Sequence, residues 1–332
     1  MAKLTKAQRK AHEEAEAILT KDRLSDDERE FVFGNWHEGA TFMSGAAGAF
    51  FTPYDLASDF AIDAGSGRVI DMCAGIGGLA YHVAQRSAWS PRGASEITCV
   101  EINPRYVEVG RKLLPEARWI NADVFDWRTL DLGRFDVAIG NPPFGRVRRS
   151  GNAPRYRGPE FEFHVIDIAA ELADRGAFLI PQTSASFRYS GTPSFDRRKT
   201  GKGVEFQNQT GWEMDGGVGI DTSLFRDQWK GTAITCEVAC FNFAETRERQ
   251  HEVTEHRTAH VIEAADAAAH LSTRSPVRVR PCPLPQCPVA HRAAQGGASA
   301  ALPGANPTCS VALTVHHQHR AHHFYEVHHP RP

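Results

Sequence analysis

Short apolar runs alternate with helical segments through the middle of this 332-residue chain. The apolar runs have the length of buried strands and lie at 68–72, 96–100, 118–121 and 135–139. This rhythm, from residue 54 to residue 144, is typical of a parallel sheet whose strands are joined by helices. A helix at 160–174, a strand at 176–181 and an edge-type strand at 233–243 continue the pattern. The chain is therefore predicted to have an α/β fold.

The two ends of the chain differ from this middle part. Residues 5–33 combine helical patterning with many charges, and Ser25 followed by three acids is typical of a capped helix start. We expect a helical N-terminal extension over residues 1–44. Residues 246–332 hold twelve of the sixteen histidines and nine of the nineteen prolines, with only two aromatic residues. Such a segment cannot bury enough apolar surface to offset the entropy of ordering, so we predict a disordered tail.

The cysteines and histidines of this tail raise the alternative of a zinc site. Cys282 and Cys287 are followed by five histidines between residues 316 and 323. Their Cys-x4-Cys spacing lies in Pro-rich chain, and no Cys-x2-Cys pair accompanies it. We therefore expect no metal.

Composition narrows the class of protein. The net charge of −2 gives no global basic field, so any surface for nucleic acid must be local. No apolar run approaches the roughly 18–20 residues of a membrane span, and the charged N-terminus lacks the apolar core of a signal peptide. Seven scattered cysteines are typical of a reducing compartment. We expect a cytoplasmic enzyme without membrane contact.

The most informative stretch follows the apolar run at 135–139. It reads Asn141-Pro142-Pro143-Phe144, an amide, two prolines and an aromatic ring where ligands bind in open α/β sheets. The prolines stiffen the turn, while the Asn141 oxygen and the peptide carbonyls are left as acceptors. Such a turn suits a planar group whose NH2 is held by two acceptors and whose ring stacks on Phe144. The simpler alternative is a Pro-Pro turn after a buried strand.

The first three predicted strands also end in chemically suitable residues. The strand at 68–72 contains Asp71 and leads into a Gly-rich turn, whose glycines and following helix start suit a close backbone approach to a ligand. Glu101 ends the second strand at the spacing of an acid that holds ribose hydroxyls, and Asp123 follows the third. A nicotinamide-dependent dehydrogenase would explain the glycines and Glu101 equally well, but it gives no role to Asn141–Phe144.

This order of motifs over residues 45–245 resembles the gamma-arranged adenine-N6 DNA methyltransferases, which use S-adenosylmethionine. The block Phe50-Phe51-Thr52-Pro53 strengthens the resemblance, since it is similar to the Phe/Tyr-Thr-Pro element of these enzymes. The resemblance implies a class I methyltransferase domain. Its fold would be Rossmann-like, with a mostly parallel seven-stranded sheet and helices on both faces.

The resemblance also assigns roles to particular residues. Its catalytic motif corresponds to Asn141, Pro142, Pro143 and Phe144. The residues expected to bind S-adenosylmethionine are Phe51, Thr52, Pro53, Asp71, Cys73, Ala74, Gly75, Gly77, Glu101, Ile102, Asp123, Val124 and Asn141. Within this set Glu101 would hold the ribose and Asp123 the adenine amine, between apolar walls from Ile102 and Val124. For Asp123 a helix cap is the alternative.

Two segments after the motif are candidates for contact with nucleic acid, 145–160 and 183–230. The first carries five arginines and no acid up to residue 157, which suits phosphate contact and base stacking. Its candidate residues are Arg146, Arg148, Arg149, Arg155, Tyr156 and Arg157. An ordinary solvated loop, with Tyr156 packed inside it, is the alternative. The second segment is rich in Ser, Gly, Asp and Gln and reads as an irregular target-recognition insert.

The resemblance implies double-stranded DNA as the partner, with a cognate restriction endonuclease as a candidate second partner. Motifs of the Asn-Pro-Pro-Phe type also occur in methyltransferases acting on guanine N2 in RNA and on glutamine side chains of proteins. The Phe51–Pro53 element and the arginines after the motif favour DNA. A further alternative is an inactive, cofactor-binding or nucleic-acid-binding module, against which the intact Asn141–Phe144 motif argues.

Overall fold

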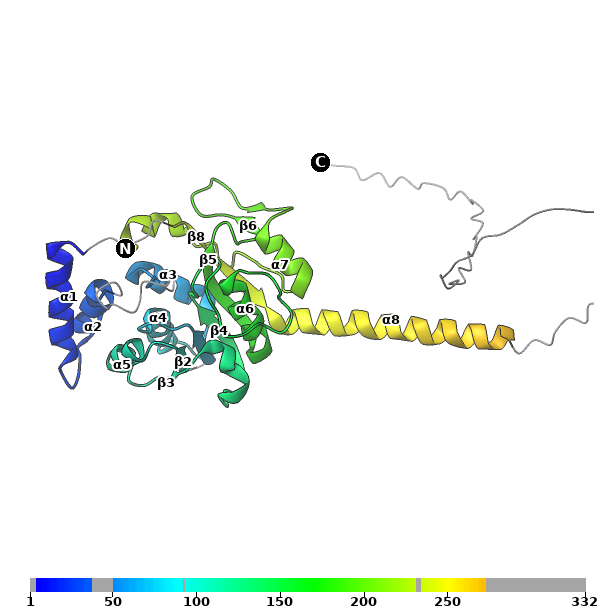
Figure 1. Ribbon diagram of the computed structural model, residues 1–332, viewed down its shortest axis with the longest axis horizontal. Helices are drawn as coiled ribbons and strands as arrows, with labels where there is room; N and C mark the ends of the chain where they lie inside the picture. The colour runs from blue at the N-terminus through cyan, green and yellow to red at the C-terminus, as the bar shows by residue number, and fades with distance from the viewer. Residues whose placement is uncertain (1–3, 38–49, 92, 231–233, 273–332) are drawn as a thin grey trace, which may run out of the picture. The chain divides into compact units, whose positions relative to one another are not determined.

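A mixed β-sheet forms the centre of the protein (Figure 1). The computed structural model describes residues 4–37, 50–91, 93–230 and 234–272, all within one unit, Met1–Thr273. The strands of the sheet are β1 (Arg68–Met72), β2 (Glu96–Glu101), β3 (Arg118–Asn121), β4 (Phe135–Gly140), β5 (Ala173–Pro181) and β8 (Cys236–Asn242). Their order is β3-β2-β1-β4-β5-β8. The first five are parallel, and β8 is antiparallel to β5.

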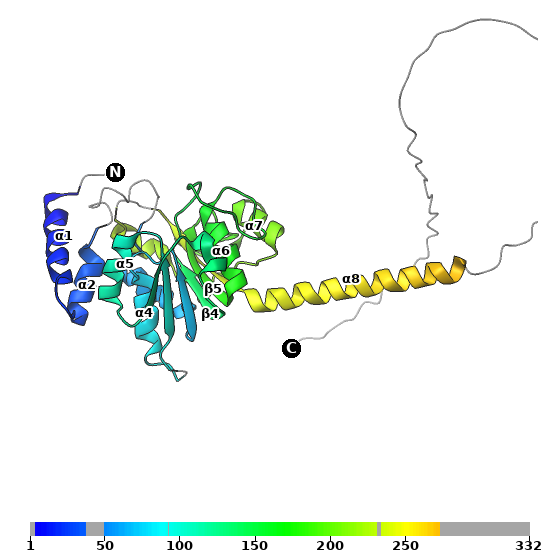
Figure 2. The same ribbon diagram turned by 60° about the horizontal axis from the view of Figure 1, so that its bottom comes forward.

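Helices cover both faces of this sheet (Figure 2). Alternate strand residues enter two separate clusters, Val69 and Ile139 in one and Ile70 and Ala138 in the other. The first cluster packs against α3 (Tyr54–Ala64), α4 (Gly78–Ser87) and α5 (Pro104–Leu113). The second packs against α6 (Phe161–Leu172), α7 (Lys202–Thr210) and the 3-10 helix η3 (Val124–Thr129). Burial on both faces explains why the strands read as continuous apolar runs.

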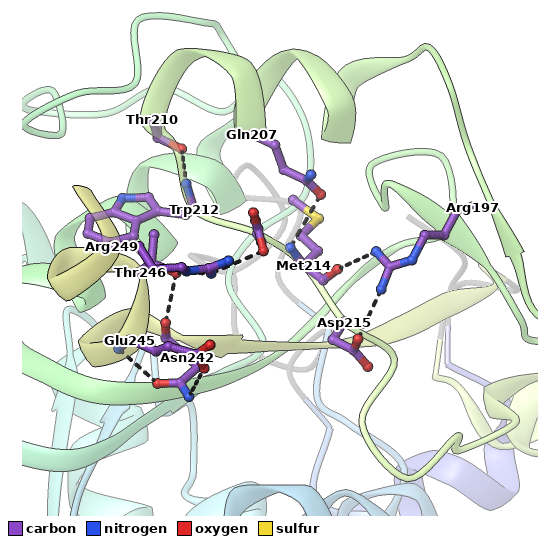
Figure 3. Close-up of polar contacts among 11 residues, drawn as sticks. Arg197, Gln207, Thr210, Trp212, Met214, Asp215, Asn242, Glu245, Thr246 and Arg249 are labelled. Atoms are coloured by element: carbon purple, nitrogen blue, oxygen red, sulfur yellow. Dashed lines mark hydrogen bonds and ion pairs between the residues drawn. The ribbon is translucent and has the colours of Figure 1, made fainter. Parts of the chain in front are cut away.

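The sheet has six strands in the described residues, not the seven expected. The outer edge of β8 is bonded instead by a single bridge, in which Asp215 and Cys240 exchange backbone hydrogen bonds of 2.9 and 2.8 Å. Beside this bridge, ion pairs join Arg197 to Asp215 and Arg249 to Glu213, each at 3.1 Å (Figure 3). A short irregular segment thus lies beside β8.

The segment 183–230 is more regular and more deeply packed than its polar composition indicates. It contains the ribbon β6 (Phe187–Arg188) and β7 (Asp196–Arg197), then α7 and the 3-10 helix η4 (Thr222–Gln228). Phe187, Phe206 and Trp212 are each at most 1% exposed. These large side chains are widely spaced in the sequence, so no local apolar periodicity revealed them.

The N-terminal residues form the expected helical pair, α1 (Lys6–Leu19) and α2 (Asp26–Asn35). Each begins with a capping box, and that of α2 pairs Ser25 with Glu28. Trp36 follows α2, is fully buried, and packs near the rings of Phe51 and Tyr106. The Lys230 ammonium donates to the Phe33 and Trp36 carbonyls at 3.1 and 2.9 Å. The extension is therefore attached to the α/β domain.

The C-terminal tail does not begin at residue 246 as predicted. Helix α8 (Phe243–Ser272) runs through this position as 30 continuous residues (Figure 2). The prolines that dominated the expectation of disorder all lie at residue 276 or beyond, and the chain before them is rich in Ala, Glu and Arg, which favour helix. The predicted tail from residue 273, with its cysteines, lies outside the described residues, as do residues 45–49 at the predicted domain start.

No helix in the described ranges combines the length and apolar character needed to cross a membrane.

Candidate active site

The four polar strand ends converge at one edge of the sheet, as predicted. Strands β1 to β4 are neighbours and parallel, so their carboxyl ends meet. Asp71 lies opposite Ile139 in β4, and Glu101 lies opposite Asn121 in β3. Asn141 directly follows β4.

The turn after β1 brings the backbone close to this edge. Cys73, Gly75 and Gly77 have φ values of 66°, 58° and 88°. Positive φ is uncommon for a residue with a side chain, so Cys73 holds a strained conformation at the site. At Gly75 an added Cβ would lie 3.0 Å from the Phe51 ring. The Phe-Thr-Pro element therefore packs directly on the glycine turn.

A hollow opens between this turn, the Phe-Thr-Pro element and the Asn141–Phe144 motif. Its lining includes seven of the predicted residues, namely Phe51, Thr52, Asp71, Cys73, Ala74, Gly75 and Asn141. It also includes Phe50, which belongs to the Phe-Thr-Pro block but was not predicted to bind, and Phe33 of α2, Ile76, Gly78 and Leu79, which the sequence did not single out. Phe33 had no local signal, because its place depends on how α2 packs on the domain. Pro53, Gly77, Glu101, Ile102, Asp123 and Val124 do not line the hollow.

Asp71 is the most unusual group in this hollow. It is 1% exposed, and within the described residues no donor reaches either carboxylate oxygen with regular hydrogen-bond geometry. Burial raises the pKa of Asp71 to about 8; the nearby Ala80 N–H, which makes no regular hydrogen bond to it, offsets this in part, and the Glu101 charge adds to it. A buried carboxylate without a donor is costly. The cationic ammonium of S-adenosylmethionine would supply the missing partner, so this residue fits the expected cofactor.

Glu101 is held rigidly beside the glycine turn. Its carboxylate accepts the Gly75 N–H and the Asn103 N–H, both at 2.8 Å. Burial raises the pKa of Glu101 to about 7, against the effect of these N–H donors. The Asn121 amide donates to the Glu101 and Ile102 carbonyls and joins β3 to this corner. Each carboxylate oxygen can accept a second hydrogen bond, which leaves capacity for ribose hydroxyls.

Asp123 caps η3, as the alternative interpretation of this residue stated. One of its oxygens accepts the Phe125 N–H at 3.0 Å, and the other accepts the Ser150 hydroxyl at 2.6 Å. The arginine-rich loop therefore folds over this part of the edge. Of the two expected apolar walls, Ile102 is 63% exposed, whereas Val124 is 6% exposed and belongs to the core.

The Asn141 side chain has a defined orientation. Its nitrogen donates to the Phe50 carbonyl at 2.9 Å and to the Thr52 hydroxyl at 3.0 Å. A carbonyl only accepts, so the nitrogen must face Phe50 and the side-chain oxygen must face elsewhere. Among the described residues no donor reaches that oxygen. Asn141 thus presents an unused acceptor at the hollow.

The rest of the motif is packed into the domain. Pro142 is buried, and Phe144 is partly buried against the cluster that contains β1 and α4. At Gly140, immediately before the motif, an added Cβ would lie 2.6 Å from the Met72 carbonyl oxygen. The close approach of β1 and β4 therefore requires glycine at this position.

Three of the six predicted nucleic-acid contacts bond to groups within the domain, and of these Tyr156 is buried, Arg155 is half-buried and Arg157 is exposed. Tyr156 is 4% exposed, donates to Glu160 and packs against Phe163 and Phe206. Arg157 donates to the carbonyls of Ala153 and Pro154.

Arg155 lies over the Trp212 ring at 4.2 Å and donates to the Thr210 carbonyl. Asp167 of α6 accepts the N–H groups of residues 155 and 156 and folds this half of the loop inward. Arg146 and Arg148 are exposed and carry no ion pair within the described residues, while Arg149 bonds Asn152.

No protein-family model and no curated protein matches this chain. Among solved structures, the methyltransferase subunit of a type I restriction-modification system from Streptococcus thermophilus is 17% identical, with a TM-score of 0.44. The match covers 65% of this chain and 48% of that one, so this chain spans about half its length. An rRNA methylase from the same organism is 12% identical, with a TM-score of 0.34, over 57% of this chain and 96% of that one.

A third structure, magnesium protoporphyrin IX methyltransferase from Synechocystis with bound cofactor, is 10% identical, with a TM-score of 0.35. That match covers 73% of this chain and 99% of that one. These similarities are too low to transfer any substrate to this chain. The strand order with its antiparallel edge strand, together with the helical layers, gives the protein an α/β class I methyltransferase-like fold.

Proposed function

We propose that this protein is an S-adenosylmethionine-dependent methyltransferase that modifies the N6 amine of adenine in DNA. The observation that carries the proposal is the fixed Asn141 amide. Its nitrogen is held by Phe50 and Thr52, so its unused oxygen is available to a substrate N–H. The Pro142 carbonyl would accept the second hydrogen of the same amine.

Two acceptors on an aromatic amine have a chemical consequence. The N6 lone pair is conjugated into the adenine ring and is a poor nucleophile. Hydrogen bonds from both N–H groups to Asn141 and Pro142 favour a more tetrahedral nitrogen, whose lone pair can then be aimed. S-adenosylmethionine supplies an electrophilic methyl group on sulfur when it is bound. The contribution of the protein is then alignment and electrostatic complementarity, without a covalent enzyme intermediate.

The cofactor assignment is supported by the groups that surround the hollow. Asp71 supplies an unpaired carboxylate for a cationic ligand, and the glycine turn allows close backbone approach. Glu101 stands beside that turn with spare acceptor capacity for ribose hydroxyls. Phe51 covers the turn as an apolar wall.

Nucleic acid is the favoured substrate class because exposed cations lie close to the motif. Arg146 and Arg148 follow Phe144 directly and are free to contact phosphates. A base within a duplex cannot reach a pocket at the sheet edge, so the target adenine would have to be flipped out, with Phe144 as its stacking surface.

The test incubates the protein with labelled cofactor and separate pools of duplex DNA, RNA and protein. We expect label in DNA, and nucleoside analysis should identify N6-methyladenine. Label confined to RNA or protein would overturn the DNA assignment in favour of guanine N2 or glutamine. Asn141→Ala should abolish transfer, whereas Asn208→Ala, at an exposed asparagine of α7, should not. Equal activity of the two variants would refute the role of Asn141.

A further inference from the structure

A fully buried carboxylate on α6 joins two turns of the candidate site. Glu162 is 0% exposed. One carboxylate oxygen accepts the Gly145 N–H at 2.7 Å, and the other accepts the Ser184 hydroxyl at 2.7 Å. Gly145 follows the catalytic motif and Ser184 follows β5, so one side chain links the turns after two neighbouring strands.

These bonds fix the far end of the catalytic motif. Gly145 gives its N–H to Glu162, and its carbonyl accepts the Phe161 N–H at 2.8 Å. At the near end, Gly140 belongs to β4, and the Asn141 side chain is bonded to Phe50 and Thr52. The motif is therefore held at both ends. The three residues between these attachments have only the freedom that a Pro-Pro turn allows.

Glu162 has no direct part in the chemistry proposed above. It does not line the hollow, and its carboxylate is fully buried with one protein donor on each oxygen. Its effect on the reaction must pass through the turn that it holds. It is a positioning residue by this geometry.

The hydrogen bonds of Glu162 depend on the length of its side chain and not on its charge. A neutral carboxyl or carboxamide at the same place could still accept from Gly145 and could donate to the Ser184 oxygen, because a hydroxyl both donates and accepts. A side chain shorter by one methylene could not span the two partners. Glu160, two residues earlier, is a natural comparison, because its buried carboxylate bonds Tyr156 and Lys202 and not the motif.

We propose that Glu162 positions the Asn141–Phe144 turn for the transfer step by holding Gly145 against Ser184. This role rests on the proposed methyl transfer. Glu162→Gln keeps the reach and removes the charge, while Glu162→Asp keeps the charge and shortens the reach. Glu160→Gln is the matched control.

The experiment measures kcat, KM for substrate, cofactor affinity by calorimetry, and hydrogen exchange of the Gly145 amide. Glu162→Asp should lose about 10²-fold in kcat with cofactor affinity unchanged, since small misplacements of reacting groups cost rates of this order. Its Gly145 amide should exchange faster. Glu162→Gln should retain most of the activity and the slow exchange, and Glu160→Gln should keep wild-type kcat.

Loss of activity in Glu162→Gln with retention in Glu162→Asp would overturn the positioning role in favour of a role for charge. An equal fall of kcat in Glu160→Gln and Glu162→Asp would reduce Glu162 to a general stabilising residue. Absence of methyl transfer by the wild type would refute the proposed function. Unchanged Gly145 exchange in Glu162→Asp would refute the positioning role on its own.

Discussion

At the scale of single residues, the pair Asp71 and Glu101 couples the proposed cofactor site to pH. Burial raises the pKa of Asp71 to about 8 and that of Glu101 to about 7. In the folded protein both carboxyls therefore stay protonated at pH values above those at which they ordinarily ionise. A cation placed beside Asp71 favours its ionised form. We expect binding of S-adenosylmethionine at pH 7 to release protons. Calorimetry in buffers of different ionisation enthalpy measures the number of protons released. A heat of binding that is the same in all buffers would contradict pairing of the cofactor ammonium with Asp71.

The same two groups should shape the stability of the protein without cofactor. Their folded-state pKa values lie above the ordinary values of 3.8 and 4.5, so the folded state binds the extra protons between those values and about 7 to 8. The free energy of unfolding should therefore fall as pH rises through this window, because the unfolded state has already lost these protons. Urea denaturation should show a shallower fall in Asp71→Asn, and an unaltered slope in the exposed control Asp227→Asn. Equal slopes in both variants would exclude Asp71.

Single residues were predictable where their role follows from the end of a strand. The sequence placed Asp71, Glu101 and Asn141 at the sheet edge because each is a polar residue at the end of an apolar run, and the structure has them there. The burial of Tyr156 and the internal contacts of Arg155 were missed because Asp167 and Trp212, the partners of Arg155, lie 12 and 57 residues further along the chain and are brought to it only by folding. The local sequence gives the charge of a side chain, but it does not predict which distant residue that side chain contacts in the folded protein.

At the scale of elements, the contact between β1 and β4 sets a strict limit on Gly140. A Cβ there would lie 2.6 Å from the Met72 carbonyl oxygen, so the strands would have to separate beside the Asn141–Phe144 motif. Gly140→Ala should destabilise the protein by about 1–3 kcal/mol, the usual range for overpacking. Gly34→Ala in α2 is the control, since nothing lies within 4 Å of its added Cβ and helical alanine is favoured over glycine. Denaturation curves in which Gly140→Ala matches wild type would contradict the limit.

The loop after the motif should separate into two functional halves. Replacing Arg146 and Arg148 with alanine should reduce the slope of log K against log salt for DNA binding by about 1–2 units, because each phosphate contact releases counterions. It should leave the melting temperature unchanged. Arg155→Ala should lower the melting temperature and leave the salt slope unchanged, since this side chain stacks on Trp212 and bonds the Thr210 carbonyl. Salt titrations of binding and thermal melts distinguish the two, and identical behaviour would contradict the division.

The order of the elements was predictable from the sequence, but the outer edge of the sheet and the last helix were not. Apolar runs identified the strands of the α/β core because burial on both faces leaves an uninterrupted pattern. The sheet was expected to have seven strands, whereas the described residues form six, and the chain near Asp215 pairs with β8 through one bridge only. Helix α8 was missed because its charged, Ala-rich residues carry helix propensity rather than an apolar stripe.

At the scale of the whole described unit, the N-terminal helices belong to the candidate site. Phe33 lines the hollow, and Lys230 bonds the carbonyls at the end of α2. Lys230→Met removes these bonds and keeps most of the side chain. A hydrogen bond from a charged group is worth about 1.5–3 kcal/mol, so we expect faster hydrogen exchange in α1 and α2 and weaker cofactor binding by calorimetry. Unchanged exchange and affinity would show that the helices are held without Lys230.

The bond from Lys230 to α2 also has a consequence for the order of synthesis. A ribosome completes Phe33, the glycine turn and Asn141 long before it adds Lys230 and the strand β8. During that interval the nascent chain carries every group of the hollow but lacks the two hydrogen bonds from Lys230 to α2 and the strand that pairs with β5. Cofactor capture should therefore begin only after release of the segment through β8. Cofactor crosslinking to nascent chains stalled before and after β8 leaves the ribosome would test this, and only the longer chains should be labelled.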